Sequence, residues 1–206
     1  MSVSVIIAAF NQWEEYTKPL IKSIWKYEPK VEIVVVDSDS QPPYPDLSYV
    51  VKTGNISYGE AINVGVKNSN GDWILSLNND VLCEGPFVEY IEGLNPDSIY
   101  GRQIIEEMGY RWLGNWLALI PRGVWNAVGG FDPNFKKCGF EDADFCVRAK
   151  LFNNIDTKPV DLPFHHFWGK TRWQDPQYPR IRQENIEYFE KKHGFRLGNN
   201  MAVTHD

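Results

Sequence analysis

Short apolar runs alternate with amphipathic segments in the first half of this sequence, and this alternation most limits the folds it can adopt. Val3–Ala9 is an apolar run, and residues 12–27 then carry apolar side chains at the three- and four-residue spacing of a helix. Residues 31–36 form a β-branched run, which is typical of a strand buried on both faces. The order predicts a mostly parallel sheet that is flanked by helices.

The same alternation continues with a strand, a helix and a strand over residues 49–51, 58–67 and 73–77. Beyond Val81 the pattern loosens into short strands and turns. Helices are expected again from about Glu141 and over residues 180–192. The sequence has no internal repeat and no linker, and 206 residues with 43% hydrophobic content suit one domain with a developed core.

Polar residues follow three of the predicted strands at the point where each strand ends. They are Ala8 to Asn11, Asp37 to Ser40, and Asn78 to Asp80. Because a parallel sheet brings the carboxyl ends of its strands to one edge, where ligands bind, we expect these clusters to lie together. Asp80 suits a hard divalent cation on a diphosphate, which needs few protein oxygen ligands. An ordinary Asx-rich turn is the alternative.

Three acids, Glu141, Asp142 and Asp144, crowd the start of a predicted helix. The partial positive charge at a helix N-terminus stabilises carboxylates, so a capping role is one explanation. One acid suffices to cap, however, and three suggest that at least one has another role, such as accepting a proton from a hydroxyl.

Two adjacent histidines, His165 and His166, lie among aromatic residues after a predicted strand that begins near Thr157. A neutral imidazole can bind a metal ion, and a packed or surface histidine pair is the alternative. Neighbouring residues of a strand face opposite sides, and a shift of one residue exchanges their faces. The sequence therefore does not decide which histidine would be the ligand.

Charge and cysteine content exclude several classes of protein. A net charge of -6 opposes a general nucleic-acid binder, because phosphate neutralisation needs a basic face. Cys83, Cys138 and Cys146 are odd in number and lack metal-ligand spacing, which favours free thiols and a cytoplasmic location. The sequence has no apolar run of the roughly 20 residues needed to span a bilayer, and its start does not resemble a signal peptide.

Six segments, in order, resemble glycosyltransferase family 2 over residues 3–170: "VSVIIAAFN", "IVVVDSDS", "GEAINVGVKNSNGDWILSLNNDV", "GGFDPNF", "GFEDADFCVRA" and "HHFWGK". The resemblance implies an α/β protein of the GT-A fold, with one Rossmann-like, mixed and mostly parallel sheet. It also implies an inverting enzyme that transfers a sugar from a nucleotide donor. Residues 1–206 would form one domain, with a nucleotide-sugar half over about 1–100 and an acceptor half over about 101–206.

The resemblance assigns roles at the predicted sheet edge. The residues expected at the nucleotide are Ala8, Phe10, Asn11, Asp37, Asp39, Asn63, Asn78 and Asn79. Asp39 is the preferred reader of the base. Asp80 and His166, with His165 second, would bind Mn²⁺ or Mg²⁺. The sequence departs from the family at Asn78, which replaces the first acid of a DxD motif, so weaker metal binding or partial independence of metal is possible.

The resemblance also implies a general base and a sugar site. Asp142 would deprotonate the acceptor hydroxyl as it attacks the anomeric carbon. The residues expected near the donor or acceptor sugar are Trp112, Trp116, Glu141, Asp144 and His165, with the turn at 129–132. Core packing is an equal alternative for the two tryptophans. Lys170 and Arg172 would approach the diphosphate, unless they are solvated surface charges.

A UDP-sugar is the expected donor, a dTDP-sugar is second, and a glycan or glycoconjugate hydroxyl is the expected acceptor. The enzyme would be soluble, with peripheral membrane contact possible. A nucleotidyltransferase would need a glycine-rich phosphate loop near the first strand, and none follows Ala8. A non-catalytic module that binds a glycan or a partner is favoured by Asn78, but the retained acids and histidines oppose it. The sequence does not predict the oligomeric state.

Overall fold

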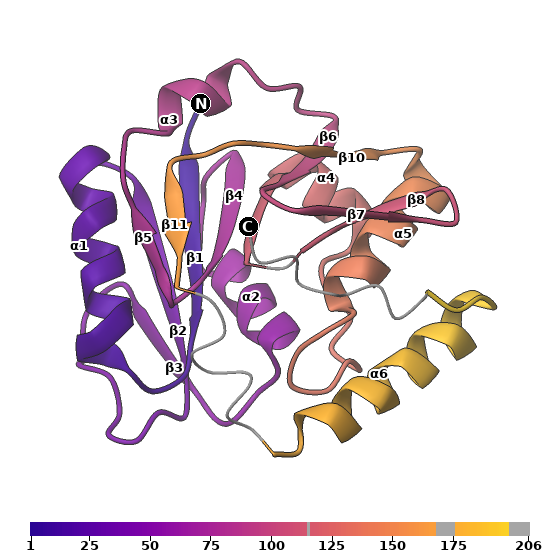
Figure 1. Ribbon diagram of the computed structural model, residues 1–206. Coiled ribbons are helices and arrows are strands. Elements are labelled where there is room, and N and C mark those ends of the chain that lie inside the picture. Colours follow the sequence, from indigo (N-terminus) through magenta and orange to yellow (C-terminus); the bar gives the residue numbers. More distant parts are fainter. Residues whose placement is uncertain (115, 168–175, 198–206) are drawn as a thin grey trace.

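A seven-stranded sheet in the order β10-β6-β9-β4-β1-β2-β3 runs through the protein (Figure 1). The computed structural model describes residues 1–114, 116–167 and 176–197. The strands are β1 (Val3–Ala9), β2 (Glu32–Ser38), β3 (Val50–Thr53), β4 (Trp73–Asn78), β6 (Ser98–Gly101), β9 (Leu117–Pro121) and β10 (Asp156–Pro159). In this sheet β9 runs antiparallel to its neighbours β4 and β6, and the other pairings are parallel.

Helices cover both faces of the sheet. They are α1 (Lys18–Tyr27), which a π-helical turn at Trp13–Thr17 precedes, α2 (Tyr58–Lys67), α3 (Val88–Glu92), α4 (Arg122–Val128), α5 (Glu141–Asn153) and α6 (Tyr178–His193). Successive residues of β1 enter different cores, since strand side chains alternate between faces. Ile6 packs in the core that includes residues of α2, α4, α5 and α6, whereas Val5 and Ile7 pack in the core that includes residues of α1 and α3.

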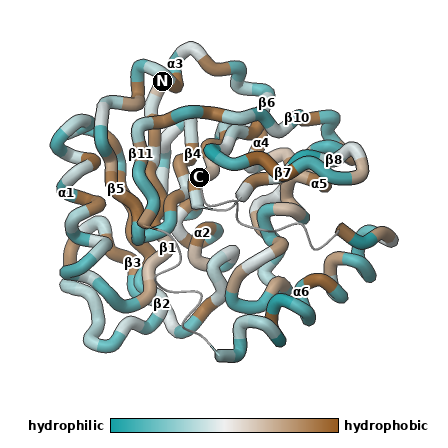
Figure 2. The backbone as a smooth tube through the Cα atoms, in the orientation of Figure 1, coloured by the Kyte–Doolittle hydropathy of each residue, from teal (hydrophilic) through white to brown (hydrophobic). Residues whose placement is uncertain are grey.

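The hydropathy of the chain follows this layered arrangement (Figure 2). Hydrophobic residues gather on the central strands, whereas α6 mixes hydrophilic and hydrophobic positions along its length. The helix α2 begins with a capping box between Ser57 and Glu60 and lies very close to β1. A Cβ atom at Gly65 would stand 2.2 Å from Cγ2 of Ile6, so only glycine allows this approach.

The sheet edge and the later half of the chain carry smaller elements. The strand β5 (Val81–Cys83) pairs with β11 (Phe164–His166), and β7 (Ile104–Glu107) pairs with β8 (Tyr110–Leu113), both antiparallel. The predicted elements of the first 80 residues are all present. The strand β2 extends two residues beyond its predicted end at Val36, because Asp37 and Ser38 continue the ladder with β3.

Candidate active site

The carboxyl ends of β1, β2 and β4 lie side by side. Ala8 pairs with Val36 of β2 on one side and with Asn78 of β4 on the other, and Ala9 pairs with Asp37. The three polar clusters of the sequence therefore meet at one edge of the sheet, as predicted.

The loops after β1 and β2 are fastened to each other at this edge. The backbone N–H of Asn11 donates to Oγ of Ser40 over 2.7 Å, and Oδ1 of Asn11 accepts from the N–H of Gln41 over 2.8 Å. Phe10 beside them is exposed. The Asn11 side chain thus holds the loop, and Phe10 is the residue of this segment that presents a ring to solvent.

Asp37 and Asp39 differ in their surroundings. Asp37 is buried, and its carboxylate accepts from the backbone N–H groups of Ser40 (3.1 Å) and Tyr44 (3.0 Å). Asp39 is exposed and has a left-handed φ of 65°. Asp37 therefore stabilises the loop, while the carboxylate of Asp39 is accessible to a ligand.

Asp80 and His166 form the centre of the site. The turn after β4 carries Asp80, and β11 brings His166 beside it, because His166 pairs with Val81. Oδ1 of Asp80 lies 3.1 Å from Nε2 of His166, and the two residues are only 4% and 8% exposed. A carboxylate oxygen and an imidazole nitrogen that converge in this way form a donor set that suits Mn²⁺.

The neighbouring residues fix the orientation of His166. The Trp116 ring stacks on the imidazole with centroids 5.0 Å apart and planes 7° apart, and the backbone oxygen of Trp116 accepts from the N–H of Asn78 over 3.1 Å. His165 is exposed on the opposite face of β11, where it contacts the Phe167 ring. The strand therefore directs His166, and not His165, toward Asp80.

The acids at the start of α5 are deeply buried. Asp142 is 1% exposed, and its Oδ1 accepts from the N–H of Ala143 over 2.8 Å. Glu141 lies near α2, since a Cβ atom at Gly59 would be 3.5 Å from that of Glu141. Burial raises the pKa of Tyr58, and the charges of Glu141 and Asp142 raise it further. The hydroxyl of Tyr58 therefore stays protonated beside these carboxylates.

The described residues include no group of three or more acidic, histidine or cysteine side chains that could hold a metal ion unaided. The pair of Asp80 and His166 would need further ligands from a bound molecule or water.

A sequence model of the family described as "Glycosyl transferase family 2" matches residues 4–156. The chain belongs to glycosyl transferase family 2. The resemblance found in the sequence motifs is thereby confirmed, and the match ends before β11 and α6. A comparison with curated proteins finds no match to this family 2 chain.

Solved glycosyltransferases share the fold of this family 2 member. The mannosyltransferase PcManGT from Pyrobaculum calidifontis, in complex with GDP-Man and Mn²⁺, aligns with a TM-score of 0.67 and 18% identity over 95% of this chain and 65% of that one. The catalytic domain of Drosophila β1,4-galactosyltransferase 7, in complex with xylobiose, aligns with a TM-score of 0.57 and 15% identity. This alignment covers 85% of this chain and 73% of the galactosyltransferase chain. TarS of S. aureus aligns with a TM-score of 0.60 and 16% identity over 100% of this chain and 46% of the TarS chain.

This chain therefore spans about two thirds of the mannosyltransferase and less than half of TarS. The predicted GT-A fold, with its mixed and mostly parallel sheet, is confirmed. None of the described helices of this family 2 chain is long and apolar enough to cross a bilayer.

Other predicted site residues of the family 2 chain have structural partners. Nδ2 of Asn63 donates to the backbone oxygen of Phe131 over 2.8 Å, and Oδ1 of Asn63 accepts from the N–H of Phe131 over 3.0 Å. These bonds connect α2 to the turn at 129–132. Trp112 on β8 is buried in the core. Core packing is thus the better account of Trp112. Trp116 is also buried in an apolar core, and its ring contacts His166. Lys170 and Arg172 lie outside the described residues.

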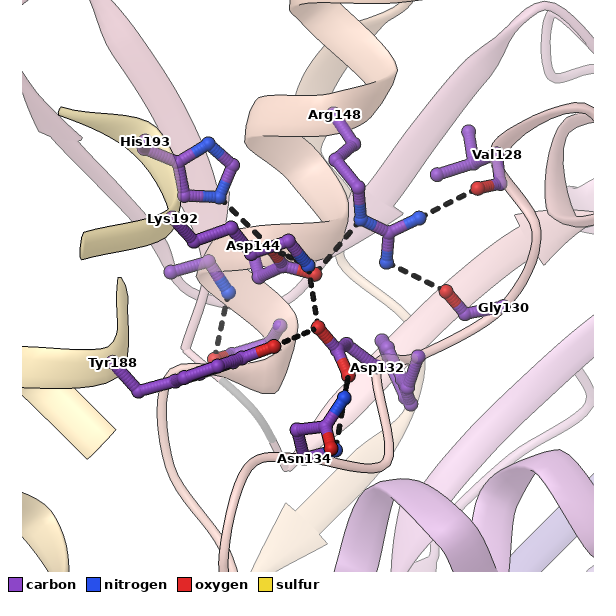
Figure 3. A network of polar contacts seen from close by, with 12 residues as sticks. Val128, Gly130, Asp132, Asn134, Asp144, Arg148, Tyr188, Lys192 and His193 are labelled. Carbon is purple, nitrogen blue, oxygen red and sulfur yellow. Dashed lines mark hydrogen bonds and ion pairs between the residues drawn. The ribbon is translucent and has the colours of Figure 1, made fainter. Parts of the chain in front are cut away.

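Asp144 lies in a network of polar and charged groups (Figure 3). Its carboxylate is fully buried and pairs with Arg148 at 2.8 Å, Lys192 at 2.6 Å and His193 at 2.9 Å. The sequence predicted Asp144 near a sugar. The structure places it in a polar network between α5 and α6, and no local sequence signal connects Asp144 to Lys192 and His193 on α6.

A second buried network beneath the sheet edge was also missed by sequence reasoning. The hydroxyl of Tyr44 lies 2.7 Å from Oγ1 of Thr17 and donates to the backbone oxygen of Asn11. Nδ2 of Asn79 donates to Thr17 over 3.2 Å. Burial raises the pKa of Tyr44 to about 12, so its hydroxyl remains a donor at neutral pH. These contacts hold the loops after β1, β2 and β4 to one another.

Proposed function

We propose that this family 2 chain transfers a sugar from a nucleoside diphosphate donor to a hydroxyl of a glycan or glycoconjugate, with inversion at the anomeric carbon. The observation that carries the proposal is the buried pair of Asp80 and His166 at the edge where β1, β2 and β4 end. A UDP-sugar is the proposed donor, with a dTDP-sugar second. A cytoplasmic setting is in keeping with three free cysteines.

The first half of the chain, about residues 1–100, would bind the donor. Phe10 and Asp39 are exposed at the sheet edge, where Ala8 and Asn11 also lie, and they suit contacts to a base and ribose. Asn11, Asp37 and Asn79 support these contacts through the loops that they fasten. Asn78 offers a neutral oxygen at the end of β4.

Asp80 and His166 would hold Mn²⁺ or Mg²⁺. The bound cation would offset the negative charge that grows on the departing diphosphate. The chemistry of the donor set supports this assignment, as one carboxylate and one imidazole leave several coordination positions for phosphate and water oxygens. PcManGT in complex with GDP-Man and Mn²⁺, and TarS in complex with UDP, lend support through the shared fold.

Asp142 would accept the proton of the acceptor hydroxyl. This proton transfer makes the oxygen a better nucleophile as it attacks the anomeric carbon from the side opposite the leaving diphosphate. Glu141 beside it and Trp116 over His166 would face the two sugars. The later half of the chain, about residues 101–206, would bind the acceptor, and xylobiose in the Drosophila complex is one such glycan.

The proposal is tested by calorimetric titration of UDP, dTDP and GDP, each with and without Mn²⁺. We expect one nucleotide to bind with an affinity that Mn²⁺ increases. Asp80→Asn should reduce that increase by about tenfold or more, since it removes the charged ligand. The exposed acid Asp97 gives a matched control, and Asp97→Asn should behave as the unaltered protein. An absence of binding at millimolar nucleotide would overturn the proposal in favour of a non-catalytic module.

A further inference from the structure

The loop before α5 has an unusual backbone. Lys137, Gly139 and Phe140 have φ values of 48°, 105° and 75°, and the side chain of Phe140 does not cap the helix that follows. Residues other than glycine rarely adopt such angles, and they keep them only where the surroundings impose them. Since Glu141 and Asp142 come directly after this loop, their positions depend on the groups that fix it.

One side chain from α6 meets most of the loop's backbone. Oδ1 of Asn185 accepts from the N–H of Lys136 over 2.9 Å. Its Nδ2 donates to the backbone oxygens of Lys136 (3.0 Å) and Gly139 (2.9 Å), with a longer contact to that of Cys138 (3.4 Å). An amide has two donor hydrogens, so the Cys138 contact shares one of them.

Asn185 is only 1% exposed, although asparagine is a poor helix former and a buried amide is costly without partners. Its hydrogen bonds to the loop account for a polar residue at this buried position of α6.

The same helix also holds both flanks of the loop (Figure 3). Nζ of Lys192 forms ion pairs with the carboxylates of Asp132, before the loop, and Asp144, after it, each at 2.6 Å. The Tyr188 hydroxyl donates a hydrogen bond to Asp132 over 2.9 Å. Residues 185, 188 and 192 have the spacing of one helix face. The loop is therefore held at its centre by Asn185 and at its ends by Lys192.

We propose that Asn185 is a positioning residue, which sets the backbone of residues 136–140 and thereby the place at which Asp142 meets the acceptor hydroxyl. The inference rests on the proposed function of Asp142. It assigns a role in the transfer step to α6, which lies outside residues 4–156 that match the family. A base displaced by about 1 Å can lower the rate about a hundredfold, so a buried amide that holds the loop before the base can govern turnover.

The test compares Asn185→Ala with Gln183→Ala, an exposed change on the same helix. We expect Asn185→Ala to lower kcat of sugar transfer about a hundredfold, while the Kd for nucleotide with Mn²⁺ stays within about twofold. Asn185→Ser keeps a hydroxyl that can serve one backbone group, and it should restore part of kcat. Gln183→Ala should leave kcat and Kd unchanged. A kcat near normal in Asn185→Ala would overturn the proposal.

Hydrogen exchange tests the same proposal without reference to activity. Amides of residues 136–144 should exchange faster in Asn185→Ala, while those of β1 and β4 keep their protection. Unchanged exchange in this segment, or equally faster exchange throughout the protein, would overturn the positioning role. A failure of the unaltered protein to bind any nucleotide would instead overturn the proposed function, so the two failures are distinguishable.

Discussion

Asp142 and Asp144 stand two residues apart on α5, yet their surroundings suit them to different roles. Asp144 contacts the side chains of Arg148, Lys192 and His193, and these contacts fix its carboxylate between α5 and α6. Asp142 instead lies with Glu141 near the Tyr58 hydroxyl. A carboxylate whose oxygens are already bound by three side chains is poorly placed to meet an acceptor hydroxyl, so Asp144 is a weak candidate for the base.

Substitution of Asp142 separates chemistry from binding. Asp142→Asn keeps the shape of the side chain but cannot accept the proton, so kcat should fall by about 10²- to 10⁴-fold. The Kd for the nucleotide should stay near its original value, because Asp142 would meet the acceptor and not the donor. Initial-rate kinetics and calorimetry measure the two quantities, with Asp97→Asn as the control. Turnover close to normal would remove Asp142 from the mechanism and direct attention to Glu141.

At single positions the sequence was informative where chemistry and strand periodicity agree. Asp80 follows a buried strand, as the apolar run before it indicates. The choice of His166 over His165 required the structure, because strand periodicity alone does not set the register of β11.

Arg148 lies four residues from Asp144, which is the spacing of a local helix pair. The contacts of Asp144 with Lys192 and His193, and the loop contacts of Asn185, could not be predicted, because they join residues more than forty positions apart through a helix packing that no local pattern encodes.

At the scale of elements, α6 is attached to the rest of the molecule through charge as well as through apolar packing. Ile186 and Phe189 enter the core, and Lys192 joins Asp132 and Asp144 beside them. Burial alone would raise the pKa of Asp132. Hydrogen bonds from Lys192, from the N–H of Asn134 and from Tyr188 outweigh it and hold that pKa well below the usual range.

This lowered pKa makes the attachment of α6 dependent on pH. An acid whose pKa is lower in the folded state stabilises that state above its unfolded pKa of about 4, and the contribution is lost as pH falls further. Asp132→Asn should therefore reduce the free energy of unfolding by about 1–3 kcal/mol at pH 7, from lost charged hydrogen bonds. Its Tm should also fall less steeply than that of the unaltered protein between about pH 4 and pH 2.

Thermal unfolding followed by circular dichroism across this pH range measures the effect, and Asp97→Asn serves as the exposed control. Parallel Tm profiles for Asp132→Asn and the unaltered protein would show that the network contributes no pH-dependent stability.

Element prediction succeeded where strands and helices alternate and failed where they do not. The helix α2 was predicted over about residues 58–67 and is found at Tyr58–Lys67. Between β5 and α5 the sequence indicated only short strands and turns. The strand β9 inserts antiparallel between β4 and β6, and its pairing depends on partners that are distant in sequence.

At the scale of the whole molecule, the sheet separates two apolar cores, and the proposed site lies where loops from several strands meet at its edge. A ligand that contacts these loops together binds only the folded chain, because the unfolded chain holds them far apart. Binding of the nucleotide should then stabilise the entire fold and not one loop alone.

This linkage gives a prediction for the melting of the intact protein. The nucleotide at a hundred times its Kd with Mn²⁺ adds about 2.7 kcal/mol of stability, which corresponds to a rise in Tm of about 5–11 °C for a chain of this size. Mn²⁺ alone should give a smaller rise, because Asp80 and His166 supply only part of a coordination sphere. In scanning fluorimetry, the nucleotide should still raise the Tm of Asp80→Asn, but Mn²⁺ should add no further rise in Tm. An equal Mn²⁺ response in both proteins would place the cation elsewhere, and the donor site would then have to bind its diphosphate through protein groups alone.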